Sequence, residues 1–177
     1  MARSSRRHAA VGITLNTDRE RTRRIALATP TGFLAFGLGS GLSPKAPGTA
    51  GSLAALIFAV PLVALPLWWG IAVVFVAFWV GVYLCGATSR ELGVHDHGGI
   101  VWDEFVGMWL VLLFVPFDLW WWLAAFLLFR LFDVLKPWPI RWLDRRVEGG
   151  FGVMIDDVLA AVYALLPLLL VQVWLAS

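Results

Sequence analysis

Cysteine and charged residues are scarce in this 177-residue sequence. The single cysteine, Cys85, lies in an apolar run and has no partner for an intrachain disulfide, so we expect it to be a small buried hydrophobe. Charged residues make up 15% of the chain, whereas an average soluble protein has about a quarter. In contrast, 60% of the residues are hydrophobic, eleven are tryptophan, and the mean hydropathy is +0.79. This composition is typical of an integral membrane protein.

The charges that are present divide unevenly along the chain. Residues 1–24 contain seven of the fourteen basic residues, and residues 25–177 contain seven basic against ten acidic residues. An acidic body suits a cation site better than a nucleic-acid surface, so we expect no nucleic-acid partner. We therefore predict a basic, flexible tail over residues 1–24 and a single membrane-embedded helical domain over residues 25–177.

Apolar runs of helical length occupy most of that domain. Runs of 17 or 18 residues reach roughly 26 Å as helices, just enough to cross the core of a bilayer. Residues 25–42 are apolar but rich in glycine, which favours an interfacial or re-entrant helix over a clean span. The runs expected to cross are Leu53–Trp69, Ile71–Thr88, Phe105–Phe117, Leu119–Leu135 and Val158–Leu175.

Basic residues are absent from one set of connections between these runs. If each run crosses once, the turns at 66–70 and 116–119 lie with the C-terminus on one side, which has no Lys or Arg. Thirteen of the fourteen basic residues fall on the other side, and Arg130 lies inside the helix that ends there. The positive-inside rule makes that side cytoplasmic. The sequence thus predicts an all-α, polytopic bundle of about five transmembrane helices.

Ionisable side chains concentrate in residues 95–104, HDHGGIVWDE, at the mouth of an apolar helix. Two histidines, His95 and His97, accompany three carboxylates, of which Asp103 and Glu104 are adjacent. Polar groups beside hydrocarbon are costly unless they are paired, bind a metal or face water. A solvated loop would explain such residues singly but not the Trp-Asp-Glu set. We therefore expect a functional site here.

Three further polar segments are predicted to lie at the same cytoplasmic end, namely residues 43–52, 130–139 and 149–157. Carboxylates that converge from several helices repel one another unless a divalent cation lies among them, and oxygen ligands suit Mg²⁺ or Mn²⁺. Zinc is less favoured because the two histidines have no cysteine partner. The predicted metal ligands are Asp103, Glu104, Asp156 and Asp157, and the predicted catalytic residues are Asp103, Glu104, Asp133, His95 and His97.

Basic side chains adjoin these carboxylates. Arg130, Asp133 and Lys136 recur every three residues on one helical side, although Arg130 and Asp133 alone would also suit a structural ion pair. Lys136 and Arg141 would bind phosphate or simply obey the positive-inside rule. A metal held by carboxylates beside basic groups is the arrangement that phosphoryl transfer needs.

The loop at residues 43–52 is a further candidate for phosphate binding. Its prolines and glycines precede a helix N-terminus, which can hold an anion, and the alternative is merely a capped helix start. The predicted substrate-binding residues are therefore Lys45, Thr49, Lys136 and Arg141. If a phosphate ester is hydrolysed at this site, either His95 or His97 would protonate the alkoxide that leaves, because histidine exchanges protons near neutral pH.

Four motifs, SPKAPGT, HDHGGIVWDEFVG, RLFDVLKPWPIRWLD and GGFGVMIDD, resemble in order and spacing the phosphatidylglycerophosphatase A family over about residues 33–175. The resemblance implies an all-helical, Mg²⁺-dependent phosphomonoesterase of the bacterial inner membrane, which converts phosphatidylglycerol phosphate to phosphatidylglycerol. It leaves open which motif residue plays which role, and whether water attacks directly or a phospho-aspartate forms. The oligomeric state does not follow from the sequence.

Other phosphatase and ion-transport patterns are absent. The sequence has no Asp-x-Asp-x-Thr motif of the haloacid-dehalogenase phosphatases and no Pro-Ser-Gly-His motif of the lipid phosphatases that use a phosphohistidine. It also lacks the Asp-Gly-x-x-Ala-Arg motif of the CDP-alcohol transferases. The main alternative is a divalent-cation transporter or small channel, since intramembrane carboxylates also line ion paths. Such a protein would need polar groups throughout the bilayer, whereas the centres of the expected helices are almost wholly apolar. A non-catalytic scaffold would leave the four motifs unexplained.

Overall fold

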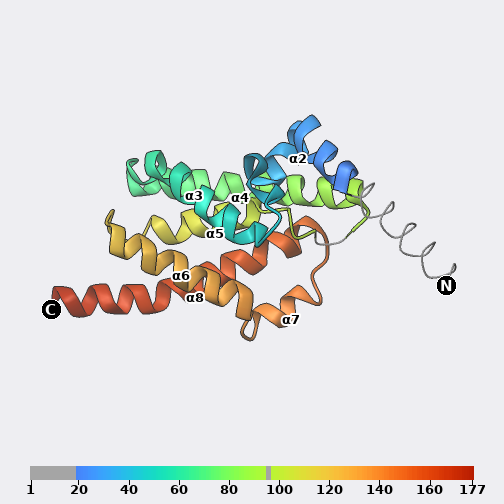
Figure 1. The fold of residues 1–177 in the computed structure, drawn as a ribbon. Coiled ribbons are helices and arrows are strands. Elements are labelled where there is room, and N and C mark those ends of the chain that lie inside the picture. Colours follow the sequence, from blue (N-terminus) through green and yellow to red (C-terminus); the bar gives the residue numbers. More distant parts are fainter. Residues whose placement is uncertain (1–18, 95–96) are drawn as a thin grey trace, which may run out of the picture.

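The computed structural model describes residues 19–94 and 97–177, and these residues form helices and turns without any strand. The predicted all-α class is therefore confirmed. The main helices lie side by side and alternate in direction (Figure 1), and α8 packs against α4, α5 and α6 while α3 packs against α5. The main helices are α3 (Pro47–Val63), α4 (Leu67–Leu92), α5 (Trp102–Leu112), α6 (Leu119–Leu135) and α8 (Gly149–Ala176).

Helix α6 shows how local chemistry sets an element's ends. Asp118 is its N-cap, and Asp118 Oδ1 accepts hydrogen bonds from the backbone N–H groups of Trp120 at 2.9 Å and Trp121 at 3.4 Å. Lys136 ends the helix in a left-handed conformation with φ of 42°, and Pro137 follows it. The predicted helix over Leu119–Leu135 is confirmed at both ends.

The first expected span is divided differently from the prediction. Helix α3 begins at Pro47 and ends at Val63, and Pro66 then serves as the N-cap of α4. Proline suits the start of a helix because its missing N–H group needs no partner there. The prediction of one helix over Leu53–Trp69 was therefore wrong at both ends, since the helix begins at Pro47 within the predicted loop, and Trp68 and Trp69 belong to α4.

Small and aromatic side chains build the interior of the bundle. Phe105, Met108 and Phe129 are fully buried, and they belong to one core cluster with alanines of α3 and α8. Large apolar side chains also cover the exterior, where Trp68 is 81% exposed and Leu170 is 71% exposed. An apolar exterior of this extent is costly in water and is typical of a lipid-facing surface.

Of the helices that the structure describes, two are long and apolar enough to cross a membrane, α4 with 26 residues and α8 with 28. Much of each helix faces outward, since 39% and 22% of their most apolar windows are buried, so they differ from the core helices of a soluble protein. Helices α3 and α6 have 17 residues each, and α5 has 11, or about 16 Å. The structure thus supports membrane association and two of the five expected spans, while a span over Phe105–Phe117 is not confirmed because α5 ends at Leu112.

The segment before α3 is broken into short helices. Residues 19–28 are helical, α2 spans Pro30–Ala35, and the 3-10 helix η1 spans Gly37–Leu42. The chain bends at the start of η1, where Gly37 and Leu38 have positive φ of 54° and 58°. Of the predicted tail, residues 1–18 lie outside the described residues, whereas Arg21 is helical and donates a hydrogen bond to the Glu91 carbonyl at 2.8 Å.

Candidate active site

A cavity of about 280 Å³ lies at the end of the bundle where α5 and α8 begin and α6 ends. The short helix α7 (Ile140–Asp144) supplies a further part of its wall. The structure therefore brings together most of the carboxylates predicted to share one end of the bundle. The predicted site residues that line this cavity are Asp103, Glu104, Asp133, Lys136, Asp156 and Asp157.

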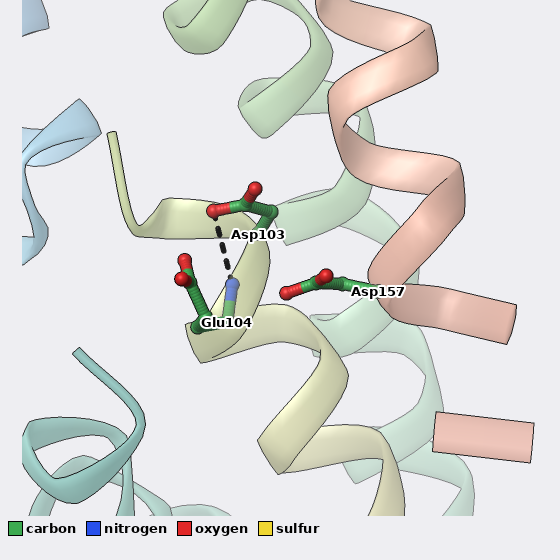
Figure 2. Close-up of side chains that lie close together, drawn as sticks. All are labelled: Asp103, Glu104 and Asp157. Atoms are coloured by element: carbon green, nitrogen blue, oxygen red, sulfur yellow. Dashed lines mark hydrogen bonds between the residues drawn. The ribbon is translucent and has the colours of Figure 1, made fainter. Parts of the chain in front are cut away.

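Three of these carboxylates converge, as Figure 2 shows. Asp103, Glu104 and Asp157 each offer one oxygen, and the three oxygens lie within 4.8 Å of one another. All three residues are buried, and two oxygens, Glu104 Oε2 and Asp157 Oδ2, have no hydrogen-bond partner among the described residues. Buried carboxylate oxygens without donors are costly. The arrangement fits a divalent cation that prefers oxygen ligands.

Local geometry explains how α5 and α8 bring this acidic triad together. Asp103 and Glu104 occupy the first turn of α5, where the helix dipole favours negative charge, and Asp103 Oδ1 accepts a hydrogen bond from the Glu104 N–H group at 3.1 Å. One turn later, Gly107 lets the helices approach closely. A Cβ atom at Gly107 would lie 2.6 Å from Phe129 Cε2 and 3.1 Å from the Asp157 carbonyl oxygen.

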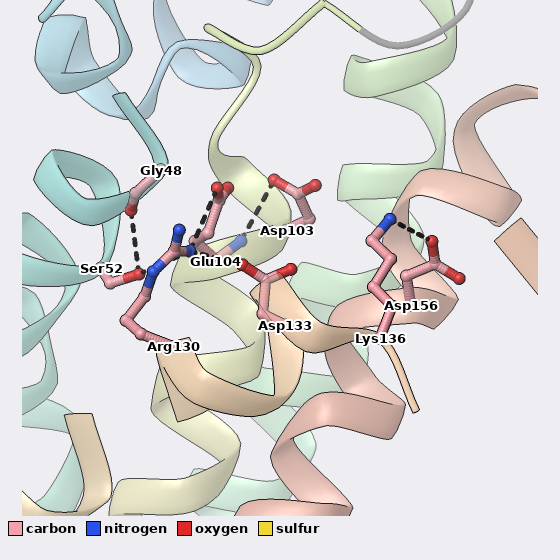
Figure 3. A network of polar contacts seen from close by, with 8 residues as sticks. All are labelled: Gly48, Ser52, Asp103, Glu104, Arg130, Asp133, Lys136 and Asp156. Carbon is pink, nitrogen blue, oxygen red and sulfur yellow. Dashed lines mark hydrogen bonds and ion pairs between the residues drawn. The ribbon is translucent and has the colours of Figure 1, made fainter. Parts of the chain in front are cut away.

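Asp156 takes a different partner from its neighbour Asp157. Successive residues of an α-helix point about 100° apart, and Asp156 Oδ2 accepts a hydrogen bond from Lys136 Nζ at 2.9 Å (Figure 3). Lys136 Nζ also lies 2.9 Å from Asp144 Oδ1. Of the four predicted metal ligands, the structure therefore brings three within 4.8 Å of one another and places the fourth, Asp156, in an ion pair in the wall of the same cavity.

The ion pair between Lys136 and Asp144, which both lie outside the long helices, shifts the pKa of each side chain. Burial disfavours the charged ammonium, but hydrogen bonds with Asp144 and Asp156 outweigh it and raise the pKa of Lys136 above its usual range. Burial likewise opposes ionisation of Asp144, yet the hydrogen bond from Lys136 lowers the pKa of that carboxyl. Asp144 was not predicted as a site residue, although it is the last residue of the motif RLFDVLKPWPIRWLD.

Arg130 lies on the other side of the triad and connects α6 to α3 and α5. Its Nη1 atom lies 2.7 Å from Asp133 Oδ2, 3.7 Å from Glu104 Oε1 and 3.5 Å from Ser52 Oγ (Figure 3). The predicted Arg130–Asp133 ion pair is therefore present, but it also contacts the triad. Ser52, which sequence reasoning missed, donates a hydrogen bond to the Gly48 carbonyl at 2.9 Å.

At Gly48, helix α3 lies directly beside Glu104 of the triad. A Cβ atom at this position would contact Glu104 Oε1 and lie 3.0 Å from Arg130 Nη2. We expect Gly48→Ala to leave the fold intact but to push Glu104 aside, because the obstructing atom is the end of a flexible side chain. If the triad holds a divalent cation, its affinity for that cation should fall roughly 10- to 100-fold. A calorimetric titration with Mg²⁺ measures this, and an unchanged dissociation constant would contradict it.

The remaining predicted residues that the structure describes lie outside this cavity. Lys45 is exposed, and Thr49, in the first turn of α3, is partly buried without lining the cavity. His97 lines a neighbouring cavity of about 670 Å³, and His97 Nδ1 accepts a hydrogen bond from the Gly99 N–H group at 3.0 Å. Arg141 lines a third cavity together with Lys136. His95 lies outside the described residues, so its catalytic role stays a prediction.

The fold and the site define a helical protein with an apolar exterior and a buried acidic cavity suited to a divalent cation. The family model of phosphatidylglycerophosphatase A matches residues 33–172, and the chain belongs to this family. The proposed site residues described above lie within the matched range. No solved structure matches the chain.

Three curated relatives are similar to the chain over most of its length. A phosphatidylglycerophosphatase A of Escherichia coli K12 is 53% identical over 140 residues, which cover 78% of this chain and 81% of that protein. A phosphatidylglycerophosphatase A of Haemophilus influenzae is 52% identical over 162 residues, covering 90% and 99%. A protein of Bacteroides thetaiotaomicron with the provisional name phosphatidylinositol-3-phosphatase is 44% identical over 141 residues, covering 75% and 87%.

Proposed function

We propose that this chain removes the terminal phosphate of phosphatidylglycerol phosphate and releases phosphatidylglycerol. The observation that carries the proposal is the convergence of Asp103, Glu104 and Asp157 beside Lys136 in one cavity at the end of an apolar bundle. A cation held by the three carboxylates and an ammonium group next to it would together attract a phosphomonoester. Membership of the phosphatidylglycerophosphatase A family supports the choice of substrate.

The proposed enzyme is a multi-pass protein of the bacterial inner membrane. Helices α3, α4, α5, α6 and α8 alternate in direction, so their turns fall at two ends of the bundle (Figure 1). The end that holds the acidic cavity also carries almost all of the basic residues that the structure describes, and the positive-inside rule would direct it to the cytoplasm. The short helix α5 would then reach only part of the bilayer and would need its neighbours to cover its ends.

The triad would hold Mg²⁺. Three carboxylate oxygens within 4.8 Å of one another match the hard oxygen ligands that this ion prefers, and water or substrate oxygens would complete the coordination. When bound, the ion would neutralise charge on the phosphate and lower the pKa of a coordinated water molecule. Asp156 would act differently, because its ion pair with Lys136 orients the ammonium group toward the cavity.

The side chains around the triad would position the phosphate and protect the reaction. Lys136 would donate to phosphate oxygens, as a point charge that can turn among several acceptors. Arg130 would hold the Glu104 and Asp133 side chains in place through the contacts of its Nη1 atom. Apolar side chains in the cavity wall, Ile100, Val134, Val147 and Val153, would limit the entry of bulk water.

Purified protein in detergent micelles should release inorganic phosphate from phosphatidylglycerol phosphate. Activity should fall by at least about a hundredfold with a chelator and return with Mg²⁺, because the triad without a cation would repel the phosphate. Phosphatidylglycerol, which has no phosphomonoester, serves as the control and should release none. Metal-dependent ion flux in liposomes without phosphate release would instead support the transporter alternative.

A further inference from the structure

A second cavity, of about 520 Å³, lies beside the acidic one and is formed by a single segment, residues 135–146. Its wall is basic and aromatic rather than acidic. The charged and aromatic residues that line it are Lys136, Arg141, Arg145, Arg146, Trp138 and Trp142. Such a combination is suited to a phosphate group attached to an apolar molecule.

The three arginines of this cavity are available for an anion. None of them forms an ion pair with a carboxylate in the described part of the chain. Arg141 Nη2 donates to the Leu135 carbonyl at 3.1 Å, and the Arg146 guanidinium lies 4.4 Å from the centre of the Trp142 ring. Asp144 is already bound by Lys136. Guanidinium groups with free donors are the strongest side-chain partners of phosphate.

The aromatic residues place this cavity at the level of lipid headgroups. Trp138 is 78% exposed and Trp142 is 46% exposed, and the Tyr163 hydroxyl donates to the Trp138 carbonyl at 2.8 Å, which anchors the segment to α8. Exposed tryptophans beside arginines are typical of the boundary between hydrocarbon and water. The anion that fits here is therefore the phosphate of a membrane lipid rather than a free ion.

Lys136 lines both cavities, so the two sites are separated by a single side chain. The substrate of the proposed function has two phosphates joined by one glycerol, a terminal phosphomonoester and a phosphodiester that carries the diacylglycerol. Resting on that proposed function, we propose that Arg141, Arg145 and Arg146 bind the phosphodiester of the lipid while the acidic cavity takes the phosphomonoester. The arginine cavity would then select lipids that carry both groups.

The double variant Arg145→Gln/Arg146→Gln tests this assignment. With phosphatidylglycerol phosphate in neutral micelles, KM should rise about tenfold or more while kcat stays within about threefold, since two charge-assisted contacts are lost away from the reacting bond. Hydrolysis of a soluble phosphomonoester without a phosphodiester, such as glycerol 3-phosphate, should keep its kcat/KM. The matched control is Arg24→Gln/Arg90→Gln, which removes two exposed charges outside this cavity and should leave KM unchanged.

A binding measurement separates this proposal from the catalytic one. Calorimetric titration with short-chain dihexanoylphosphatidylglycerol, which has the anionic phosphodiester but no phosphomonoester, should show binding that the double variant weakens about tenfold and the control pair does not. Wild-type binding by the double variant, or an equal loss in both variants, would overturn the arginine site. If no protein releases phosphate from phosphatidylglycerol phosphate, the proposed function fails, and the titration still decides whether the arginines bind the phosphodiester.

Discussion

Asp157→Asn should abolish turnover and leave the fold intact. Asp157 is 4% exposed, and its Oδ2 atom has no hydrogen-bond partner among the described residues. One oxygen of Asp157 lies within 4.8 Å of an oxygen of Asp103 and of Glu104. Asparagine keeps the shape but removes a charged metal ligand, and the loss of like-charge repulsion should not destabilise the protein without metal. We expect kcat/KM to fall by at least about a thousandfold at saturating Mg²⁺. Phosphate release and thermal unfolding of the same preparation measure both effects.

The matched control for this change is Asp118→Asn. Asp118 caps α6 at the opposite end of the bundle, and asparagine is an equally good N-cap, so turnover should stay within about twofold. Asp103→Asn and Glu104→Gln should resemble Asp157→Asn. Activity above about a tenth of wild type in any of the three would count against a triad that binds the metal directly.

Among the substitutions proposed for this protein, Arg130→Met should cause the largest loss of stability. The Arg130, Glu104 and Asp133 side chains are 17%, 11% and 16% exposed, and the substitution leaves the two carboxylates without their cation. Removing one partner of a buried ion pair costs about 3–5 kcal/mol, because the other charge stays buried and uncompensated. The free energy of unfolding in detergent, measured without added metal, should fall by about this amount.

Compensating changes test the cause of that loss. Adding Asp133→Asn to Arg130→Met removes one stranded charge and should restore part of the stability, and Mg²⁺ should restore more, because it binds only the folded triad. The control is Arg141→Met, which removes an exposed arginine without a carboxylate partner and should change stability little. A normal unfolding free energy for Arg130→Met would show that Arg130 does not neutralise the triad.

Elements whose ends depend on local chemistry were predictable from the sequence. The cap at Asp118 and the stop at Lys136 and Pro137 delimit α6, and both lie within the segment itself. The position of Asp103 and Glu104 at the start of α5 was predictable for the same reason. The break at Pro66 was predicted as a turn at 66–70, but the apolar residues Trp68 and Trp69 were assigned to the wrong helix, because hydropathy alone does not locate the end of a helix.

The choice among carboxylates depended on long-range packing. Asp156 and Asp157 are adjacent in the sequence and chemically identical, yet only Asp157 joins the triad. The packing of α8 against α5 places Asp157 beside Asp103 and Glu104, whereas Asp156 contacts Lys136 at the end of α6. Ser52 reaches Arg130 across 78 positions of the chain, and Asp144 reaches Lys136 only because α7 folds back beside α8. No local spacing in the sequence indicates these pairs.

By itself the sequence determined the helical class, the apolar exterior and the end of the bundle where acidic and basic groups gather, because these follow from composition and from signals a few residues apart. The tertiary structure alone decided which carboxylates meet, that Arg130 and Lys136 flank them, and that a second basic cavity adjoins the first. The physical reason is that ion pairs and metal sites depend on distances of a few ångströms between helices. Those distances are set by the close approach of glycines such as Gly48 and Gly107, whose effect appears only when the helices are packed.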